Sequence, residues 1–285
     1  MISEGVATSV PHLISLGGGV QSSVMALMAS AEEIRPMPRA AIFADTGNEP
    51  QSVYSWLRWL EPRLAFPLLV VRCKQTLAEG SLRMRVTRDG RKFSSTDIPF
   101  FTRNADGSQG KITSRGCTRD YKIAPILRAA RQLACIKRGQ KTAGVVQWIG
   151  ISVDEVVRMK PSRERWAENR WPLIEAGMTR HDCLRWMERR GLPKPPRSAC
   201  VFCPYHNDHE WRRLKTEEPD EFARAIEFER RLQEVKGASD NFESVPFLHR
   251  SLVPLAEVDF STDDERGQGL LNLNFGNECF GMCGV

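Results

Sequence analysis

A run of three glycines, Gly17 to Gly19, constrains this chain more than any other feature, because an apolar segment precedes it and a helical pattern follows. Residues 12–16 predict a strand, and the apolar spacing in residues 22–30 predicts a helix. Glycines let a backbone approach an anion closely, and a helix N-terminus offers unpaired N–H groups and a positive dipole end. The sequence therefore predicts a phosphate-binding turn; the alternative is a tight turn without a ligand.

The candidate phosphate-binding residues are the glycines and the polar residues that open the helix. They are Gly17, Gly18, Gly19, Gln21, Ser22 and Ser23. Serine hydroxyls would add donors to those of the backbone. The segment lacks the lysine of a Walker A loop and the glycine spacing of the dinucleotide-binding motif, so neither of those nucleotide sites is predicted.

Strand and helix patterns alternate along the first half of the chain. Residues 40–44, 67–71 and 145–151 are apolar runs that predict strands, and residues 52–60 predict a helix between two of them. Hydrophobic residues make up 41% of the chain, which is enough to build a core. We therefore expect an α/β fold, with a Rossmann-like parallel sheet covered by helices on both faces.

The expected organisation is a nucleotide-binding α/β domain over residues 11–175 and a mostly helical, cysteine-bearing region over residues 176–285. A polar, basic insertion interrupts the first domain at about residues 74–116. From Arg72 to Arg131 there are fourteen lysines and arginines against five acidic residues. This excess of positive charge suits a polyanion such as a nucleotide or a nucleic acid, and a solvated arginine-rich loop is an equally weighted alternative.

No segment of the sequence predicts association with a membrane. No apolar run approaches the ~20 residues that span a bilayer. The first residues also lack a basic stretch ahead of an apolar one, so no signal peptide is predicted. These features predict a cytoplasmic protein.

Two more polar segments follow predicted strands, where open α/β sheets place their ligand contacts. The first supplies Asp45, Thr46, Gly47 and Glu49, and the second supplies Gly150, Glu155 and Arg158. A loop stabilised by an Asx turn is the alternative for the first segment, and a surface arginine is the alternative for the role of Arg158 in binding polyphosphate.

The glycine segment resembles the PP-loop, Ser-Gly-Gly-x-Asp-Ser, of the phosphoadenosine-phosphosulfate (PAPS) reductase and ATP pyrophosphatase family. Gly18, Gly19 and Ser22 match it, while Gly17 replaces the leading serine and Gln21 the aspartate. The resemblance covers roughly residues 11–205 and includes the segment around Asp45. It implies a PP-loop fold that binds ATP with Mg²⁺ and cleaves it to AMP and pyrophosphate, with Ser22 among the catalytic groups.

Cys200 and Cys203 form a C-x-x-C pair, which is a half-site for a metal or a cluster. Cys117 is the expected third ligand, since residues 117–125 resemble a "C-T-x-x-x-K-x-x-P" element of related ATP pyrophosphatases. We expect a [4Fe-4S] cluster first, zinc second and a redox dithiol third. His206 and His209 are the alternative ligands for zinc. The remaining internal cysteines, Cys73, Cys135 and Cys183, are interpreted as small buried hydrophobic residues.

Cys279 and Cys283 lie at the end of the chain. Cysteines near a terminus suit sulfur carriage, because a thiolate must travel between donor and acceptor. The Glu278-Cys279 pair resembles the Glu-Cys-Gly tail of sulfonucleotide reductases, which implies a catalytic role for Cys279. Completion of a metal site with Cys200 and Cys203 is the equally weighted alternative.

These features give three competing functions. The first is an ATP-dependent enzyme that activates an acceptor, such as tRNA or DNA, for sulfur transfer from a donor protein such as a cysteine desulfurase. The second is a PAPS or APS reductase in which Cys279 attacks the sulfonyl sulfur. The third is a metal-bearing nucleic-acid binding module without enzymatic activity.

Overall fold

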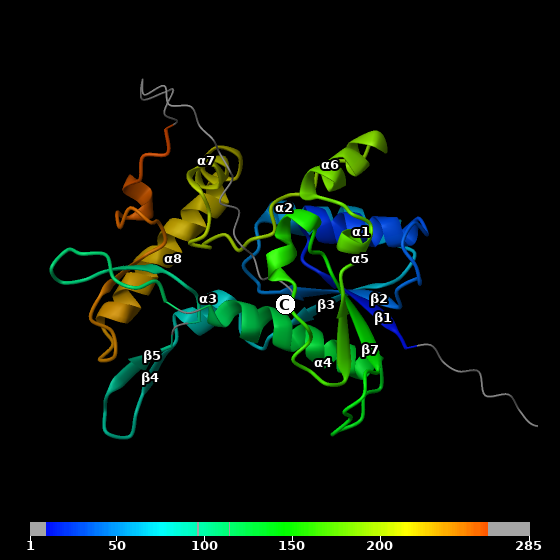
Figure 1. Ribbon diagram of the computed structural model, residues 1–285. Coiled ribbons are helices and arrows are strands. Elements are labelled where there is room, and N and C mark those ends of the chain that lie inside the picture. Colours follow the sequence, from blue (N-terminus) through cyan, green and yellow to red (C-terminus); the bar gives the residue numbers. More distant parts are fainter. Residues whose placement is uncertain (1–9, 96, 114, 262–285) are drawn as a thin grey trace, which may run out of the picture.

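A computed structural model describes residues 10–95, 97–113 and 115–261 of the chain (Figure 1). Its centre is a five-stranded parallel sheet of order β3-β2-β1-β7-β8. The strands are β1 (His12–Leu16), β2 (Ala40–Asp45), β3 (Leu68–Arg72), β7 (Val145–Ile149) and β8 (Ala167–Arg170). The predicted α/β fold with a Rossmann-like parallel sheet is thus confirmed.

Alternating side chains of the central strands separate two cores. Ile14 and Leu16 of β1 point to the face covered by α1 (Val20–Ser30), α2 (Gln51–Leu60), α5 (Pro172–Glu175) and α6 (Arg180–Arg189). Leu13 points to the opposite face, which α4 (Ala124–Leu133) covers. One π-helical turn, η2 (Thr118–Ile123), leads into α4. Burial on both faces explains the continuous apolar strands.

A third core joins the basic insertion to the region after residue 198. Leu77 and Phe100 of the insertion pack with Trp211, Phe228 and Leu248. The insertion contains α3 (Leu77–Ser81), β4 (Met84–Val86), β5 (Lys92–Ser94) and β6 (Phe101–Arg103). The later region contains α7 (Asp208–Glu217), α8 (Pro219–Gly237) and β9 (Val245–Phe247), with β6 paired to β9. The described apolar residues of the insertion are therefore packed against the later part of the chain.

Three short 3₁₀ segments complete the secondary structure of the described residues: η1 (Glu61–Arg63), η3 (Val153–Arg158) and η4 (Leu255–Glu257). Within the same described ranges, no helix is both long and apolar enough to cross a membrane.

Candidate functional site

The predicted phosphate-binding turn lies between β1 and α1. Gly18 has φ +77°, a left-handed conformation that glycine adopts without strain. Gly19 is the N-cap of α1 and provides no side-chain cap, so the first amides of the helix depend on other acceptors. The Gly17 amide donates to Ser22 Oγ at 3.1 Å, and that hydroxyl lies 3.4 Å from the Gly19 carbonyl oxygen. Ser22 thus fixes the shape of the loop.

The end of β7 passes very close to this turn. A Cβ atom on Gly150 would lie 2.8 Å from the Ser22 backbone nitrogen and 2.9 Å from its Cα atom. Only glycine allows this approach, because real Cβ contacts are essentially never that short. The structure therefore brings the segment that contains Gly150 into contact with the glycine turn, and both were predicted from the sequence to bind the nucleotide.

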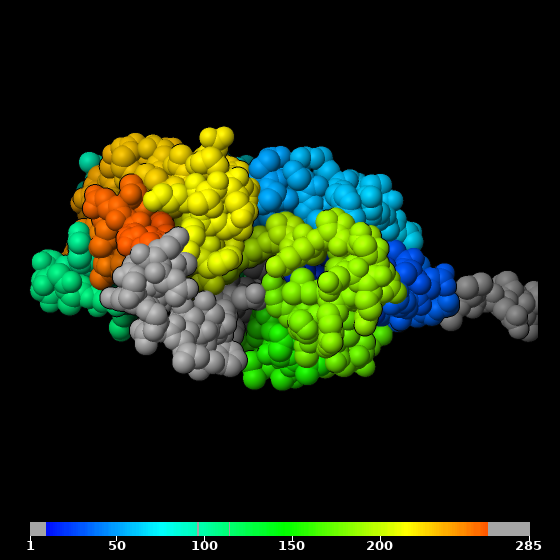
Figure 2. Space-filling model, turned by 90° about the horizontal axis from the view of Figure 1, so that it is seen from above, coloured from blue at the N-terminus to red at the C-terminus, as the bar shows by residue number. Residues whose placement is uncertain are grey.

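The glycine turn forms part of the floor of a cleft of about 740 Å³. In the space-filling view, the segments containing α7 (yellow) and α6 (yellow-green) border a hollow with blue N-terminal atoms at its base (Figure 2). Among the described residues, five basic side chains line the cleft: Arg158, Arg180, Lys194, Arg197 and Arg213. The acidic side chains that line it are Glu155, Glu210 and Glu217. The balance of charge favours an anionic ligand.

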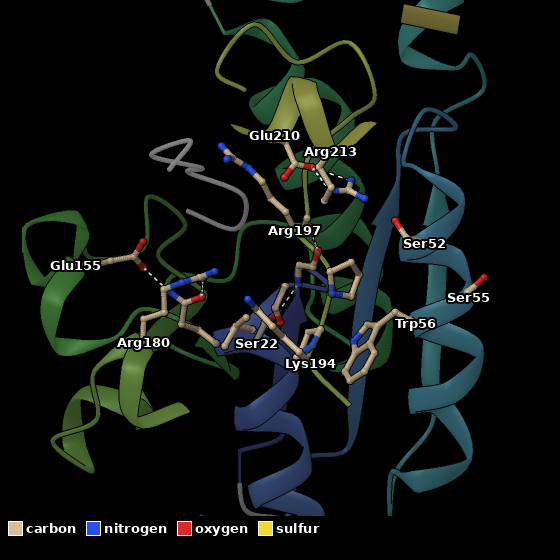
Figure 3. A pocket seen from close by; sticks show the side chains of 18 of the residues that line it. Ser22, Ser52, Ser55, Trp56, Glu155, Arg180, Lys194, Arg197, Glu210 and Arg213 are labelled. Carbon is tan, nitrogen blue, oxygen red and sulfur yellow. Dashed lines mark hydrogen bonds and ion pairs between the residues drawn. The ribbon is translucent and has the colours of Figure 1, made fainter. Parts of the chain in front are cut away.

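Gln21, which replaces the aspartate of the PP-loop pattern, organises one side of the cleft. Its Nε2 lies 3.3 Å from Glu155 Oε2, and its Oε1 accepts a hydrogen bond from Arg180 at 3.1 Å (Figure 3). Arg158 pairs with the same Glu155 carboxylate at 2.5 Å. The predicted residues Glu155 and Arg158 therefore lie at the cleft, and Gln21 links them to the phosphate loop.

A proline-rich segment between α6 and α7 covers the other side of the loop. We call residues 194–198 the strap. Ser198 Oγ donates to the Gly17 carbonyl oxygen, and a Cβ atom on Gly19 would lie 3.4 Å from Ser198 Cβ. Arg197 donates to the Tyr205 carbonyl oxygen at 3.0 Å, which holds this cation at the cleft. In the sequence, the two basic residues of Lys-Pro-Pro-Arg are the feature that could have indicated an anion-binding role for the strap.

Ser23, another of the predicted phosphate-binding residues, lies away from the surface of the cleft. It is fully buried, and its hydroxyl accepts a hydrogen bond from Trp56 Nε1 at 2.9 Å. The structure thus places the Ser23 side chain in the packing between α1 and α2, whereas Ser22 lines the cleft.

The loop after β2 lies at the carboxyl end of its strand, but its predicted binding residues do not line the cleft. Asp45 accepts hydrogen bonds from Tyr54 at 2.8 Å and Arg72 at 2.6 Å. Gly47 has φ +74°, and its Cβ would lie 2.6 Å from Thr76 Cγ2. These contacts give Asp45 and Gly47 a structural role in this arrangement.

Thr46 and Glu49 connect this loop to the C-x-x-C pair. Cys200 Sγ lies 3.4 Å from Thr46 Oγ1 and 3.7 Å from Glu49 Oε1, and Lys122 pairs with Glu49 at 3.4 Å. Burial, followed by the nearby Glu49 carboxylate, raises the pKa of the Cys200 thiol well above its ordinary value. A thiol of this kind remains protonated and weakly reactive while it stays in this environment.

Cys117 and Cys203 pack against the same core as Cys200. Within the described part of the chain, however, no three His, Cys, Asp or Glu side chains are grouped so as to hold a metal ion. Cys279 and Cys283, the other predicted sulfur groups, lie outside the described residues.

The two histidines considered as zinc ligands differ in their surroundings, since one is buried and the other is exposed. His206 is buried with Nε2 2.9 Å from the Cys200 carbonyl oxygen, and burial, followed by the charge of Arg197, lowers the pKa of His206 to about 4. His209 is exposed and lines the cleft. His206 therefore supports the backbone of the C-x-x-C segment.

Comparison of the sequence with models of known protein families and with curated proteins finds no match. The class of the molecule accordingly follows from its architecture, which is an α/β fold with a five-stranded parallel sheet and a cleft at the carboxyl end of β1.

Proposed function

We propose that this chain is an ATP-dependent enzyme of the PP-loop class, which cleaves ATP to AMP and pyrophosphate and activates a nucleic-acid acceptor for sulfur transfer. The observation that carries the proposal is the position of the glycine turn and the first turn of α1 on the floor of a cleft whose walls carry five basic side chains. A polyphosphate is the ligand that matches such a combination of unpaired amides and cations.

Residues on the floor of the cleft and residues on its walls would bind different phosphates of ATP. Amides of the glycine turn and the Ser22 hydroxyl would bind the α-phosphate, where negative charge grows as the acceptor attacks phosphorus. Arg158 and Arg180 on one wall, with Lys194 and Arg197 on the other, would hold the departing pyrophosphate. Ser22 and Glu155 offer oxygen atoms to the Mg²⁺ that accompanies ATP, and this ion would offset phosphate charge.

The reaction would proceed by two displacements. A nucleophilic oxygen of the acceptor attacks the α-phosphorus, the bond to the α,β-bridging oxygen breaks, and pyrophosphate leaves. The terminal sulfur of a persulfide on a donor protein, such as a cysteine desulfurase, then attacks the activated atom and displaces AMP. A further thiol cleaves the resulting S–S bond, which forms a disulfide with the donor cysteine and leaves the sulfur on the acceptor. Positioning of these groups in one cleft would provide much of the acceleration.

The test uses the full chain purified without oxygen and incubated separately with ATP, PAPS and APS. The expected products from ATP are AMP and pyrophosphate, detected by chromatography. Gly18→Val should abolish nucleotide binding, because valine is strained at the left-handed φ of this position and the loop must change shape. The protein should nevertheless remain folded. Formation of ADP and phosphate would contradict the proposal, and consumption of PAPS or APS instead of ATP would favour the reductase.

A further inference from the structure

A hairpin of the insertion stands apart from the central sheet. Residues 83–94, which we call the basic hairpin, contain β4 and β5 paired as a separate two-stranded antiparallel sheet. Figure 1 shows the hairpin extending away from the body of the molecule, beyond α3. The cleft-lining residues do not include any of its members.

The basic hairpin is anchored at its base and closed firmly at its tip. At the base, Ser94 exchanges hydrogen bonds with the side chain of Asn241 at 3.0 and 3.1 Å, and closer to the tip the Lys92 amide donates to Asp240 Oδ2 at 2.6 Å. At the tip, the Gly90 amide donates to the Thr87 carbonyl oxygen at 3.0 Å. A ligand that binds the hairpin would therefore meet a preformed surface and lose little free energy in ordering it.

Positive charge on the basic hairpin is largely uncompensated. Arg85, Arg88 and Lys92 are exposed, and within the described residues none of them forms an ion pair with a carboxylate. Asp89, the acidic residue of the hairpin, is already engaged by Arg91 at 2.6 Å. Three cations thus project from a narrow ribbon, a pattern that matches the spaced negative charges of a phosphate backbone.

The apolar residues of the hairpin distinguish a nucleic acid from a membrane surface. Phe93 is 45% exposed and lies opposite Arg85 in the ladder, so the two share one face. Val86 is 67% exposed and lies opposite Lys92 on the other face. A lipid surface needs its apolar residues together on one side. An aromatic ring beside an arginine on a ribbon suits a base stacked on the ring and a phosphate on the guanidinium.

We propose that the basic hairpin is a docking arm for a single nucleic-acid strand that crosses its tip, with a base stacked on Phe93 and phosphates at Arg85 on the same face, at Arg88 in the turn and at Lys92 on the opposite face. This inference goes beyond the proposed ATP chemistry and is tested without nucleotide. Its failure would leave the cleft chemistry untouched, and failure of the cleft chemistry would leave the docking arm intact.

The experiment measures fluorescence anisotropy of a labelled single-stranded oligonucleotide of about 20 nucleotides, a length that covers one such binding site. The full chain is compared with the triple variant R85A/R88A/K92A over salt concentrations from about 50 to about 300 mM. A matched control, K137A/R138A/K141A, removes the same charge from exposed residues between α4 and β7, at the opposite end of the strands from the phosphate loop.

The hairpin triple variant should lose at least about tenfold in affinity at low salt and show a salt slope shallower by about 2, since each lost phosphate contact contributes about 0.7. The control should bind as the unmodified chain does. Phe93→Ala should weaken binding by about fivefold or more without changing the salt slope. Equal losses in both triple variants would overturn the proposal, and so would binding of anionic phosphatidylglycerol vesicles without binding of the oligonucleotide.

Discussion

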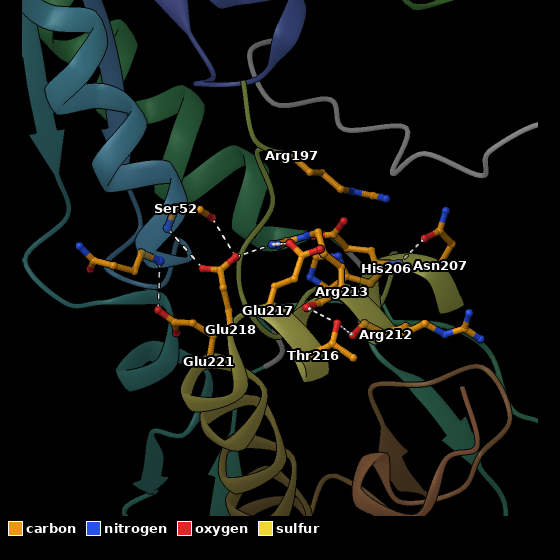
Figure 4. A network of polar contacts seen from close by, with 12 residues as sticks. Ser52, Arg197, His206, Asn207, Arg212, Arg213, Thr216, Glu217, Glu218 and Glu221 are labelled. Carbon is orange, nitrogen blue, oxygen red and sulfur yellow. Dashed lines mark hydrogen bonds and ion pairs between the residues drawn. The ribbon is translucent and has the colours of Figure 1, made fainter. Parts of the chain in front are cut away.

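The Glu218 carboxylate accepts hydrogen bonds from the Ser52 amide at 3.3 Å and from the Ser52 hydroxyl at 3.0 Å, so a residue between α7 and α8 caps the N-terminus of α2 (Figure 4). Glu221 adds a bond from the Gln51 amide at 3.0 Å. The helix has no side-chain cap of its own, because Pro50 occupies the N-cap position. Negative charge at this end also complements the helix dipole.

Replacement of Glu218 should therefore destabilise the protein. Glu218→Ala removes the acceptor of two Ser52 hydrogen bonds and a 2.5 Å partner of Arg213, so we expect a loss of about 2 kcal/mol in the free energy of unfolding. Urea unfolding followed by tryptophan fluorescence measures this. Glu217→Ala is the control, because Glu217 is 66% exposed and should change stability by less than about 0.5 kcal/mol. Equal effects of the two changes would contradict the capping role.

Gly150→Ala should disturb the phosphate loop more than the overall fold. The added Cβ would meet the Ser22 backbone at 2.8 Å, so the first turn of α1 must shift. A shift of this kind misplaces the amides that would bind phosphate, and ATP affinity should fall at least about tenfold. Calorimetric titration measures the affinity. Gly237→Ala is the matched change, because its Cβ would meet no atom within 4 Å, and it should bind ATP normally.

Arg197→Ala should weaken ATP binding through loss of charge at the cleft. The guanidinium is held there by the Tyr205 carbonyl oxygen, and paired hydrogen bonds to phosphate strengthen nucleotide binding by about 1–3 kcal/mol. Affinity should fall about tenfold or more, with a weaker dependence on salt. Arg189→Ala removes an exposed charge at the end of α6 and should have no effect on affinity. Unchanged ATP affinity of the Arg197 variant would show that the strap does not contribute to nucleotide binding.

Because Lys236 is buried, we expect the stability of the protein to rise with pH in the alkaline range. The ammonium group of Lys236 is buried near Phe100 and Phe242 and donates to Ser94 Oγ at 2.9 Å. Burial lowers the pKa of Lys236 to about 8, and the charge of Asp97 opposes this shift only in part. The ordinary value in an unfolded chain is about 10.4. Between these two pH values the unfolded chain binds more protons, so the free energy of unfolding should rise with pH.

Lys236→Met should remove that rise. Relative to the variant, the original protein should gain roughly 2–3 kcal/mol of stability between pH about 8 and pH about 10.5. Urea unfolding at several pH values measures the difference. Lys137→Met, at an exposed position, should retain the rise. Parallel pH profiles for the original protein and the Lys236 variant would show that the buried ammonium group does not titrate in this range.

The sequence predicted the central sheet well because its strands are apolar on both faces and glycines mark the turn into α1. It missed β8, whose residues Ala-Glu-Asn-Arg are polar and lie on an edge strand. It also missed α7, where only Glu210, Trp211 and Leu214 are buried. Partners distant in the chain stabilise both elements, and local patterns carry little information about them.

The candidate site was predictable where backbone geometry determines the role of a residue. Gly18 and Gly150 need to be glycine because of a left-handed φ and a close approach. The role of Arg180 depends on its distance from Gln21, which only the folded chain establishes. The sequence likewise could not tell that the Asp45 carboxylate would be occupied by Arg72 and Tyr54.

The core shared by the insertion and the later part of the chain affects how the protein is made. Phe100 packs in the same core as Phe228, and β7 and α6 are translated between them. During synthesis, the apolar side chains of the insertion cannot be buried until their partners, which are translated later, have left the ribosome. Nascent chains that end before α8 should therefore expose these side chains and engage chaperones, whereas the α/β sheet can assemble earlier.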